Sequence, residues 1–212
     1  ITPEHEIWVL ENDIQSEIGT GLGSIFRLNP RTGRTKQISG LLPSYNKFGI
    51  SAAGPGGDVH FTEWGLGGEL PFGGYLSTLV RSSDTVSARV STSIGNTLHF
   101  AGALATSDLG YSYLNIDGGI LEYIPFTNPS FSEIYLAPTA TYLGGVAVNP
   151  TNTSVFSSAG DSGQAIYKIG ASQTSLLTNV QTARMLDLEA NGQLLAAAKD
   201  GLVGQGGGVV RV

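Results

Sequence analysis

The sequence contains no cysteine, few charged residues and no long apolar run. Without cysteine in its 212 residues, the chain can form no disulfide, no thiolate metal site and no cysteine nucleophile. Charged residues make up 13%, against roughly 25% in an average globular protein. No stretch reaches about 18 consecutive apolar residues, so no transmembrane helix is predicted.

The charge balance is acidic, with 11 Lys and Arg against 17 Asp and Glu and a net charge of -6. Nucleic acids and anionic membranes attract basic surfaces, so neither is an expected partner. Oligomeric state is left open by the sequence. The lack of cysteine suits both a reducing compartment and a bacterial surface, and a secreted or cell-surface location is favoured, with a cytoplasmic one left open.

Glycine is abundant, at 30 residues, and hydrophobic residues reach 41%, enough for a core. This composition favours many strands and tight turns over helical bundles, coiled coils or disorder. Short β-type runs follow turn residues at 6–11, 58–63, 97–102, 154–159 and 193–198. Their centres, at 8, 60, 99, 156 and 195, are 52, 39, 57 and 39 residues apart. Propeller blades repeat every 40–50 residues or so.

Each repeat is interpreted as up to four strands, with the runs above as second strands. The predicted inner strands are 48–53, 89–92, 146–149 and 185–189. The predicted third strands are 24–29, 75–80, 111–115, 165–169 and 209–212. The predicted outer strands are 35–39, 121–126, 174–178 and a weak one near 83–86, and 127–143 is the longest outer connection.

The sequence therefore predicts an all-β fold, a β-propeller of about five blades formed by one domain over residues 1–212. The first unit begins at its second strand and the last ends at its third, so ring closure is imperfect and a larger parent propeller is an open alternative. A β-sandwich, which also has strands every 8–12 residues or so, is the other fold considered.

One decapeptide carries a family resemblance. Gly54–Glu63, with the sequence GPGGDVHFTE, resembles the repeat motif of streptogramin-lyase propellers. The units 23–33 and 163–169 resemble NHL and SMP-30/gluconolactonase blades. The resemblance implies a propeller and, for the lyase and lactonase types, a metal-dependent enzyme. Those families have six or seven blades, and the His and Glu constellation expected in the lyase is not repeated near the C-terminus.

Two carboxylates occupy the same column of adjacent repeats. Glu11 and Glu63 end neighbouring second strands, and Asp161 and Asp200 fall in loops on the same predicted face. Several oxygen donors together suit Ca²⁺ or Mg²⁺. These four residues are the candidate metal ligands, and the alternative is that the glutamates are solvated or cap backbone N–H groups.

Two histidines, His60 and His99, also share a column of the predicted second strands. Their apolar neighbours favour packing between blades, and a general base is the alternative. His60 and Glu63 are three residues apart, so their side chains are predicted to point to opposite faces of the sheet.

A ligand surface is the other candidate site. Trp64, Tyr45 and Asn46 lie at loop ends, where an aromatic ring packs on sugar C–H groups and an amide bonds hydroxyls. Arg89 and Arg184 begin predicted inner strands and could hold a carboxylate. The alternative for these arginines is pairing with a loop carboxylate such as Asp187 or Glu189.

Three functions follow from this reading. The first is a binding propeller that uses its loop face for a small molecule, a sugar or a protein. The second is a metal-dependent lactonase or streptogramin-lyase-like enzyme, in which Ca²⁺ or Mg²⁺ polarises an ester oxygen. The third is a structural extracellular module. Fold alone does not decide between them.

Overall fold

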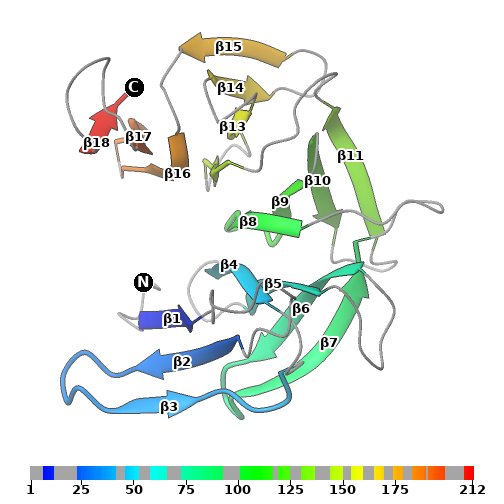
Figure 1. Cartoon of the computed structure of the whole chain (residues 1–212), viewed down its shortest axis with the longest axis vertical. Coiled ribbons are helices and arrows are strands. Elements are labelled where there is room, and N and C mark those ends of the chain that lie inside the picture. Colours follow the sequence, from blue (N-terminus) through cyan, green and yellow to red (C-terminus); the bar gives the residue numbers. More distant parts are fainter. Residues whose placement is uncertain are drawn as a thin grey trace. The chain divides into compact units, whose positions relative to one another are not determined.

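The structure of the chain is a computed structural model, and Figure 1 shows it coloured along the sequence. It describes residues 7–11, 23–41, 46–52, 58–65, 73–92, 101–116, 119–124, 130–136, 144–149, 154–159, 165–169, 174–178, 183–189, 191–198 and 208–212. Over these ranges every regular element is a β-strand. No helix long and apolar enough to cross a membrane occurs in them.

Two compact units divide the chain, residues 1–101 and 102–212, and each is described separately. The first unit holds two sheets. The first sheet consists of β1 (Ile7–Glu11), β2 (Ser24–Leu28) and β3 (Thr35–Gln37). The second sheet consists of β4 (Asn46–Ala52), β5 (Val59–Gly65), β6 (Gly73–Val80) and β7 (Thr85–Ser91).

The second unit holds three sheets. The third sheet consists of β8 (Ala101–Thr106), β9 (Ser112–Ile116), β10 (Gly119–Ile124) and β11 (Ser130–Leu136). The fourth sheet consists of β12 (Val146–Val148), β13 (Val155–Ala159), β14 (Ala165–Ile169) and β15 (Thr174–Thr178). The fifth sheet consists of β16 (Ala183–Leu188), β17 (Leu194–Ala198) and β18 (Gly208–Arg211).

Each sheet is an antiparallel meander, because strand order in space follows strand order in the chain. This is the topology of a propeller blade. The strand β1 contacts β4, just as β9 contacts β12 and β13 contacts β16. The first strands β12 and β16 of the second unit also contact each other, so contact with β4 does not by itself give the rank of β1 in its blade. The five sheets match the predicted number of repeats, and the fifth sheet contains three described strands.

The core of the first unit lies between its two sheets. Ile25 of β2 and Ile38 pack with Val59 and Phe61 of β5 and with Leu79 of β6, all nearly inaccessible to solvent. Side chains alternate between the two faces of a strand. Val59 and Phe61 therefore share the face of β5 that meets the first sheet, and Glu63 continues the same face.

In the second unit the fourth sheet is packed on both faces. Val146 and Val148 of β12 belong to one core cluster with Tyr113 of β9, whereas Ala147 between them packs with Leu194 of β17 in another. A strand covered on both faces reads as a continuous apolar run rather than an alternating one. This accounts for the Val-Ala-Val sequence of β12.

A glycine at position 145 permits this close packing. The Gly145 N–H donates to the Ser158 hydroxyl at 2.7 Å. A Cβ at Gly145 would lie 2.8 Å from the backbone of Met185 and would also meet the backbone nitrogen of Leu186 in β16. Real Cβ atoms do not approach backbone so closely, so the contact of β12 with β16 requires glycine here.

The third repeat differs from its prediction. The predicted second strand 97–102 lies mostly outside the described residues, and β8, which begins at Ala101, is the first strand of its sheet. The segment 111–115, predicted third, lies in the second strand β9, and 121–126, predicted outer, lies in the third strand β10. His99, which the sequence pattern aligned with His60, lies outside the described residues. Alternation alone marks strands without their rank in a sheet.

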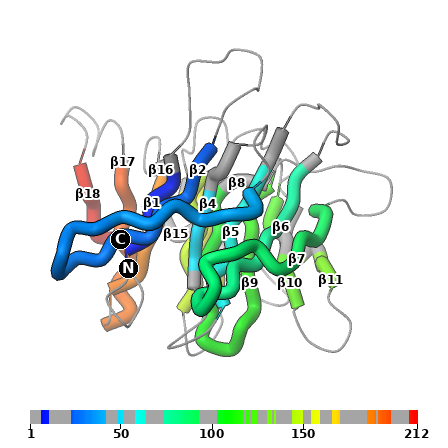
Figure 2. The backbone as a smooth tube through the Cα atoms, turned by 90° about the horizontal axis from the view of Figure 1, so that it is seen from below, coloured from blue at the N-terminus to red at the C-terminus, as the bar shows by residue number. Residues whose placement is uncertain are grey.

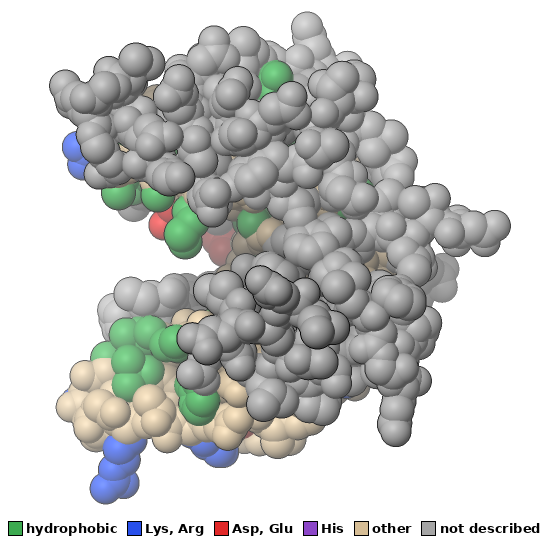
Figure 3. Space-filling model, viewed as in Figure 1, with side chains coloured by type: hydrophobic (Ala, Val, Ile, Leu, Met, Phe, Trp, Pro, Cys, Tyr) green, Lys and Arg blue, Asp and Glu red, His purple; other side chains and the backbone are tan. Residues whose placement is uncertain are grey.

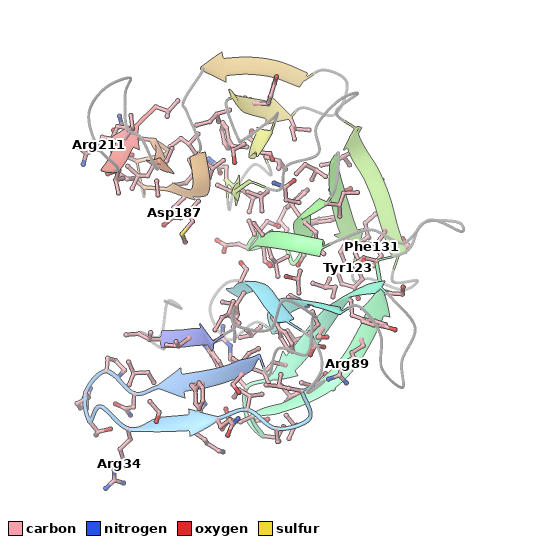
Figure 4. All side chains as sticks on the ribbon, viewed as in Figure 1. Arg34, Arg89, Tyr123, Phe131, Asp187 and Arg211 are labelled. Atoms are coloured by element: carbon pink, nitrogen blue, oxygen red, sulfur yellow. The ribbon has the colours of Figure 1, made fainter. Side chains whose placement is uncertain are left out.

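Two further predictions in this part of the chain are corrected. The predicted inner strand 89–92 is the end of the outer strand β7. The predicted connection 127–143 contains β11, whose Phe131 pairs across the ladder with Tyr123 of β10. Their ring centroids are 5.2 Å apart, and Figure 4 shows the two side chains together. This tilted aromatic pair stabilises the outer strand β11, which was predicted as part of a connection.

Candidate functional site

The most buried charged group in the described residues is Glu63, near the end of β5, with no accessible surface. Its Oε2 accepts a hydrogen bond from the Ser77 hydroxyl of β6 at 2.5 Å. The same oxygen accepts one from Arg89 Nε of β7 at 2.9 Å. The three side chains of this cluster come from three adjacent strands. Ser77 lies opposite Arg89 of β7 and opposite Phe61 of β5, which is two residues before Glu63 on the same face of that strand.

Arg89 links this cluster to the first sheet. Its Nη2 donates to the backbone carbonyl of Gly40, which follows β3. The side chain is 27% exposed, and Figure 4 shows it beside β7. Arg89 was predicted to hold an anionic ligand, with a carboxylate such as Asp187 or Glu189 as its alternative partner. In the structure its partner is Glu63, and Glu189 pairs instead with Arg211 at 3.1 Å.

His60 lies on the other face of β5, as its three-residue offset from Glu63 predicts. Its Nδ1 is 3.2 Å from the Thr78 hydroxyl of β6, and the side chain is 4% exposed. Burial lowers the pKa of His60 from its usual value, and the nearby Asp58 charge partly offsets this. Burial therefore favours the neutral imidazole, which agrees with the predicted packing role.

Two predicted ligand-binding residues are neighbours in the second sheet. The register pairs Asn46 of β4 with Trp64 of β5, and Trp64 with Gly74 of β6. Both positions lie at strand ends beside the segments 42–45 and 66–72. The structure thus pairs the strand positions of Asn46 and Trp64, which are 18 positions apart in sequence, and it describes the side chain of neither.

The remaining predicted site residues lie at the limits of the described structure. Tyr45, Asp161 and Asp200 fall outside the described residues. For Glu11 and Arg184 the structure describes the strand position in β1 and β16 but not the side chain. Their roles stay predictions.

The candidate metal site can be compared with the structure only at Glu63. That carboxylate is already neutralised by Arg89, so a divalent cation there would have to compete with a guanidinium. No group of three or more possible ligands of the His, Cys, Asp and Glu types occurs in the part of the chain that the structure describes.

Asp84, in the turn between β6 and β7, is a buried charge that the sequence reading missed. It adopts a left-handed conformation with φ of 53° and is 2% exposed. Its Oδ2 accepts from Arg27 at 2.8 Å and Lys36 at 2.6 Å, both on the first sheet. The turn sequence Ser-Ser-Asp was a signal for this conformation, because aspartate tolerates it better than most residues.

Asp84 also extends the contact between the two sheets. Its carbonyl accepts from Ser39 N at 3.2 Å, and Ser39 O accepts from Val86 N at 3.3 Å. Arg27 lies over the Trp8 ring at 5.9 Å. The first and second sheets are thus joined by Asp84, which pairs with Arg27 and Lys36, and by Arg89, which bonds both Glu63 and the Gly40 carbonyl.

Comparison with known proteins gives likeness in fold. No protein-family model matches the chain, and no curated protein matches it in sequence. A Bacteroides caccae protein of unknown function aligns with a TM-score of 0.59 and 13% identity, over 97% of this chain and 72% of that chain. Virginiamycin B lyase from Staphylococcus aureus aligns with a TM-score of 0.61 and 10% identity, over 98% of this chain and 74% of that chain.

A catalytically inactive variant of the same lyase with quinupristin aligns with a TM-score of 0.63 and 12% identity, over 100% of this chain and 81% of that chain. These alignments confirm the predicted resemblance at the level of fold: the chain has the β-propeller fold of streptogramin lyases. Fold likeness at such identities does not transfer an activity.

Proposed function

We propose that this chain is a ligand-binding β-propeller that takes a small molecule or a carbohydrate at the end of the second sheet where Asn46 and Trp64 are cross-strand neighbours. The register of β4 with β5 carries this proposal. A tryptophan ring offers an apolar surface to C–H groups, and an asparagine amide can both donate to and accept from hydroxyls. Gly74, opposite Trp64 on β6, adds no side chain of its own to this position.

Binding is favoured over catalysis by the state of the titratable groups in the described residues. A general acid or base must reach the proton that it transfers. His60 is buried and bonded to Thr78, and Glu63 is buried and bonded to Arg89. Neither group is placed to reach an external substrate.

Tryptophan fluorescence tests the proposal, because the chain has only two tryptophans, Trp8 and Trp64. Titration with a panel of glycans and small molecules, quinupristin included, should reveal a ligand that changes emission. Trp64→Ala should then weaken its binding more than tenfold in calorimetry, and Asn46→Ala should weaken it less. Trp8→Phe is the matched control and should leave affinity unchanged. Equal affinity of wild type and Trp64→Ala for every ligand found would refute the site.

The likeness to streptogramin B lyases favours a second candidate, a metal-dependent lyase. In this candidate Glu11, Asp161 and Asp200 would hold Ca²⁺ or Mg²⁺ through their carboxylates. A bound divalent cation would polarise an ester oxygen of the substrate. This chain's carboxylates would hold and orient the cation.

Thermal unfolding with Mg²⁺, Ca²⁺ or EDTA separates the two candidates. A cation that binds only the folded state raises the unfolding temperature by mass action. The lyase candidate requires such a rise, its loss in Glu11→Gln or Asp161→Asn, and cleavage of quinupristin visible by mass spectrometry. Asp108→Asn, at an exposed position, is the matched control. No rise and no cleavage would leave the metal-free binding protein.

A further inference from the structure

Positive charge is concentrated in the β2–β3 hairpin of this acidic chain. Four of the 11 Lys and Arg residues, Arg27, Arg31, Arg34 and Lys36, lie within ten positions, and no Asp or Glu occurs between 18 and 57. Since the net charge is -6, the other residues together carry -6 minus +4, which is -10. At physiological salt charges interact over about 8 Å, so a partner touching this hairpin meets a basic surface.

Among the described residues, two of these cations have an acidic partner and two do not. Arg27 and Lys36 share the Asp84 carboxylate. Arg31 and Arg34 lie in the exposed turn, and their guanidinium groups contact no acidic side chain of the described residues. Figure 4 shows Arg34 projecting away from the hairpin, and Figure 3 shows Lys and Arg side chains standing out from this surface.

The turn that carries the two arginines is held in one conformation. The Asn29 side-chain oxygen accepts from the backbone N–H groups of Arg31 at 3.0 Å and Thr32 at 3.1 Å. Asn29 N donates to Arg34 O at 2.9 Å, and Gly33 adopts a left-handed φ of 69°. A preformed turn lowers the entropy lost when a partner binds.

The strand next to these arginines has an open edge. Ile38 N donates to Ile25 O in β2, and alternation then turns the backbone groups of Thr35 and Gln37 away from β2. No described strand pairs with β3 on that outer side. Two residues later, Ser39 uses the same side to bond Asp84 and Val86 as a parallel bridge. The outer edge is therefore able to accept a strand, and Figure 2 shows the hairpin as a long blue segment.

We propose that the outer edge of β3, together with Arg31 and Arg34, binds an extended acidic segment of a partner protein as an added strand. A peptide backbone would pair with the N–H and C=O groups of the open edge, and its carboxylates would pair with the two guanidinium groups. No aromatic residue lies between 29 and 37 to stack on a sugar ring, which disfavours a polysaccharide. This surface is separate from the Asn46–Trp64 position and does not depend on the proposed ligand.

Fluorescence anisotropy with a designed probe tests the charge requirement. The probe is a fluorescein-labelled peptide of about twelve residues alternating Glu and Val, the length of an ordinary strand pair with flanks. We expect Arg31→Gln with Arg34→Gln to weaken its binding about fivefold to tenfold, as two exposed charge-assisted contacts would. Lys168→Gln with Arg211→Gln removes the same charge elsewhere and should change affinity less than about twofold. Equal effects of the two double variants, or no binding of the probe, would overturn the proposal.

A proline substitution tests the added strand itself. Thr35→Pro removes an outward N–H without breaking the ladder to β2, since proline is tolerated on edge strands. Thr35→Pro should weaken binding of the probe peptide by about fivefold or more, whereas Thr35→Val should leave its affinity unchanged. Should Thr35→Pro fail to fold, N-methylation of alternate probe residues blocks the same bonds from the peptide side. Strand addition would be refuted if neither Thr35→Pro nor N-methylation changed the affinity of the probe. Binding of heparin or phosphatidylserine vesicles in place of the probe would also refute it.

Discussion

Replacing Arg89 by methionine would remove the guanidinium from the buried Glu63 carboxylate while keeping most of the aliphatic side chain. Arg89 Nε is 2.9 Å from Glu63 Oε2, and its Nη2 also bonds Gly40 O. Glu63 has no solvent-accessible surface, and its Oε2 also accepts a hydrogen bond from the Ser77 hydroxyl. The substitution therefore tests whether this ion pair stabilises the contact between the first and second sheets.

Removing one member of a buried ion pair costs about 3–5 kcal/mol. Arg89 is 27% exposed, so solvent already screens part of the attraction and lowers the expected cost to about 2–3 kcal/mol. For a chain of this length each kcal/mol corresponds to about 2–4 °C in unfolding temperature. Arg89→Met should therefore lower that temperature by about 5–10 °C.

Urea unfolding followed by circular dichroism measures this cost, with Glu63→Gln as the matched variant. A glutamine oxygen still accepts from Ser77 and Arg89, so Glu63→Gln should cost less than Arg89→Met, about 1 kcal/mol. The double variant Glu63→Leu with Arg89→Met removes both charges and should be more stable than Arg89→Met alone. A loss below about 0.5 kcal/mol for Arg89→Met, or simple additivity in the double variant, would contradict the reasoning.

Three other perturbations test the packing and charge of the fold. Gly145→Ala should destabilise the second unit by about 2 kcal/mol in urea unfolding, because its Cβ would overlap the β16 backbone; Gly208→Ala, in open space, is the control, and equal stabilities would contradict the close approach. Asp84→Asn keeps the left-handed turn but loses its charge to Arg27 and Lys36, so we expect a cost of about 1–2 kcal/mol, and an unchanged urea midpoint would speak against the pair. Burial lowers the His60 pKa in the folded state, so the unfolded state binds more protons as pH falls below about 6.5, and stability should decrease there. His60→Gln should flatten this pH dependence, and an unchanged pH profile would exclude His60 as its source.

Much of the fold could be predicted from local pattern. The runs at 58–63, 154–159 and 193–198 begin and end within two residues of β5, β13 and β17. Their alternation and flanking turn residues are local properties, and such properties identify strands. The strand ranks predicted for the third repeat were wrong because 111–115 and 121–126 have the same alternating pattern whatever their rank. Only the hydrogen-bonded partners in the sheet assign the rank of a strand.

The site was less predictable than the fold because its partners are distant in sequence. The pairing of Asn46 with Trp64 spans a hairpin, and the pairing of Glu63 with Arg89 spans three strands. Glu63 was predicted as a candidate metal ligand and Arg89 as an anion holder. Nothing in either local sequence shows that their charges neutralise each other, since that depends on strand register.

Turn chemistry and side-chain alternation act over a few residues, so the amino-acid sequence is enough to predict the all-β class, the five repeats and the positions of most strands. The rank of each strand, the burial of Glu63 and Asp84, and the exposure of Arg31 and Arg34 in a turn beside an open sheet edge depend on the tertiary structure. A net charge of -6 gives no sign of that basic hairpin, because net charge sums over the chain whereas a partner meets only the groups that folding brings to one surface.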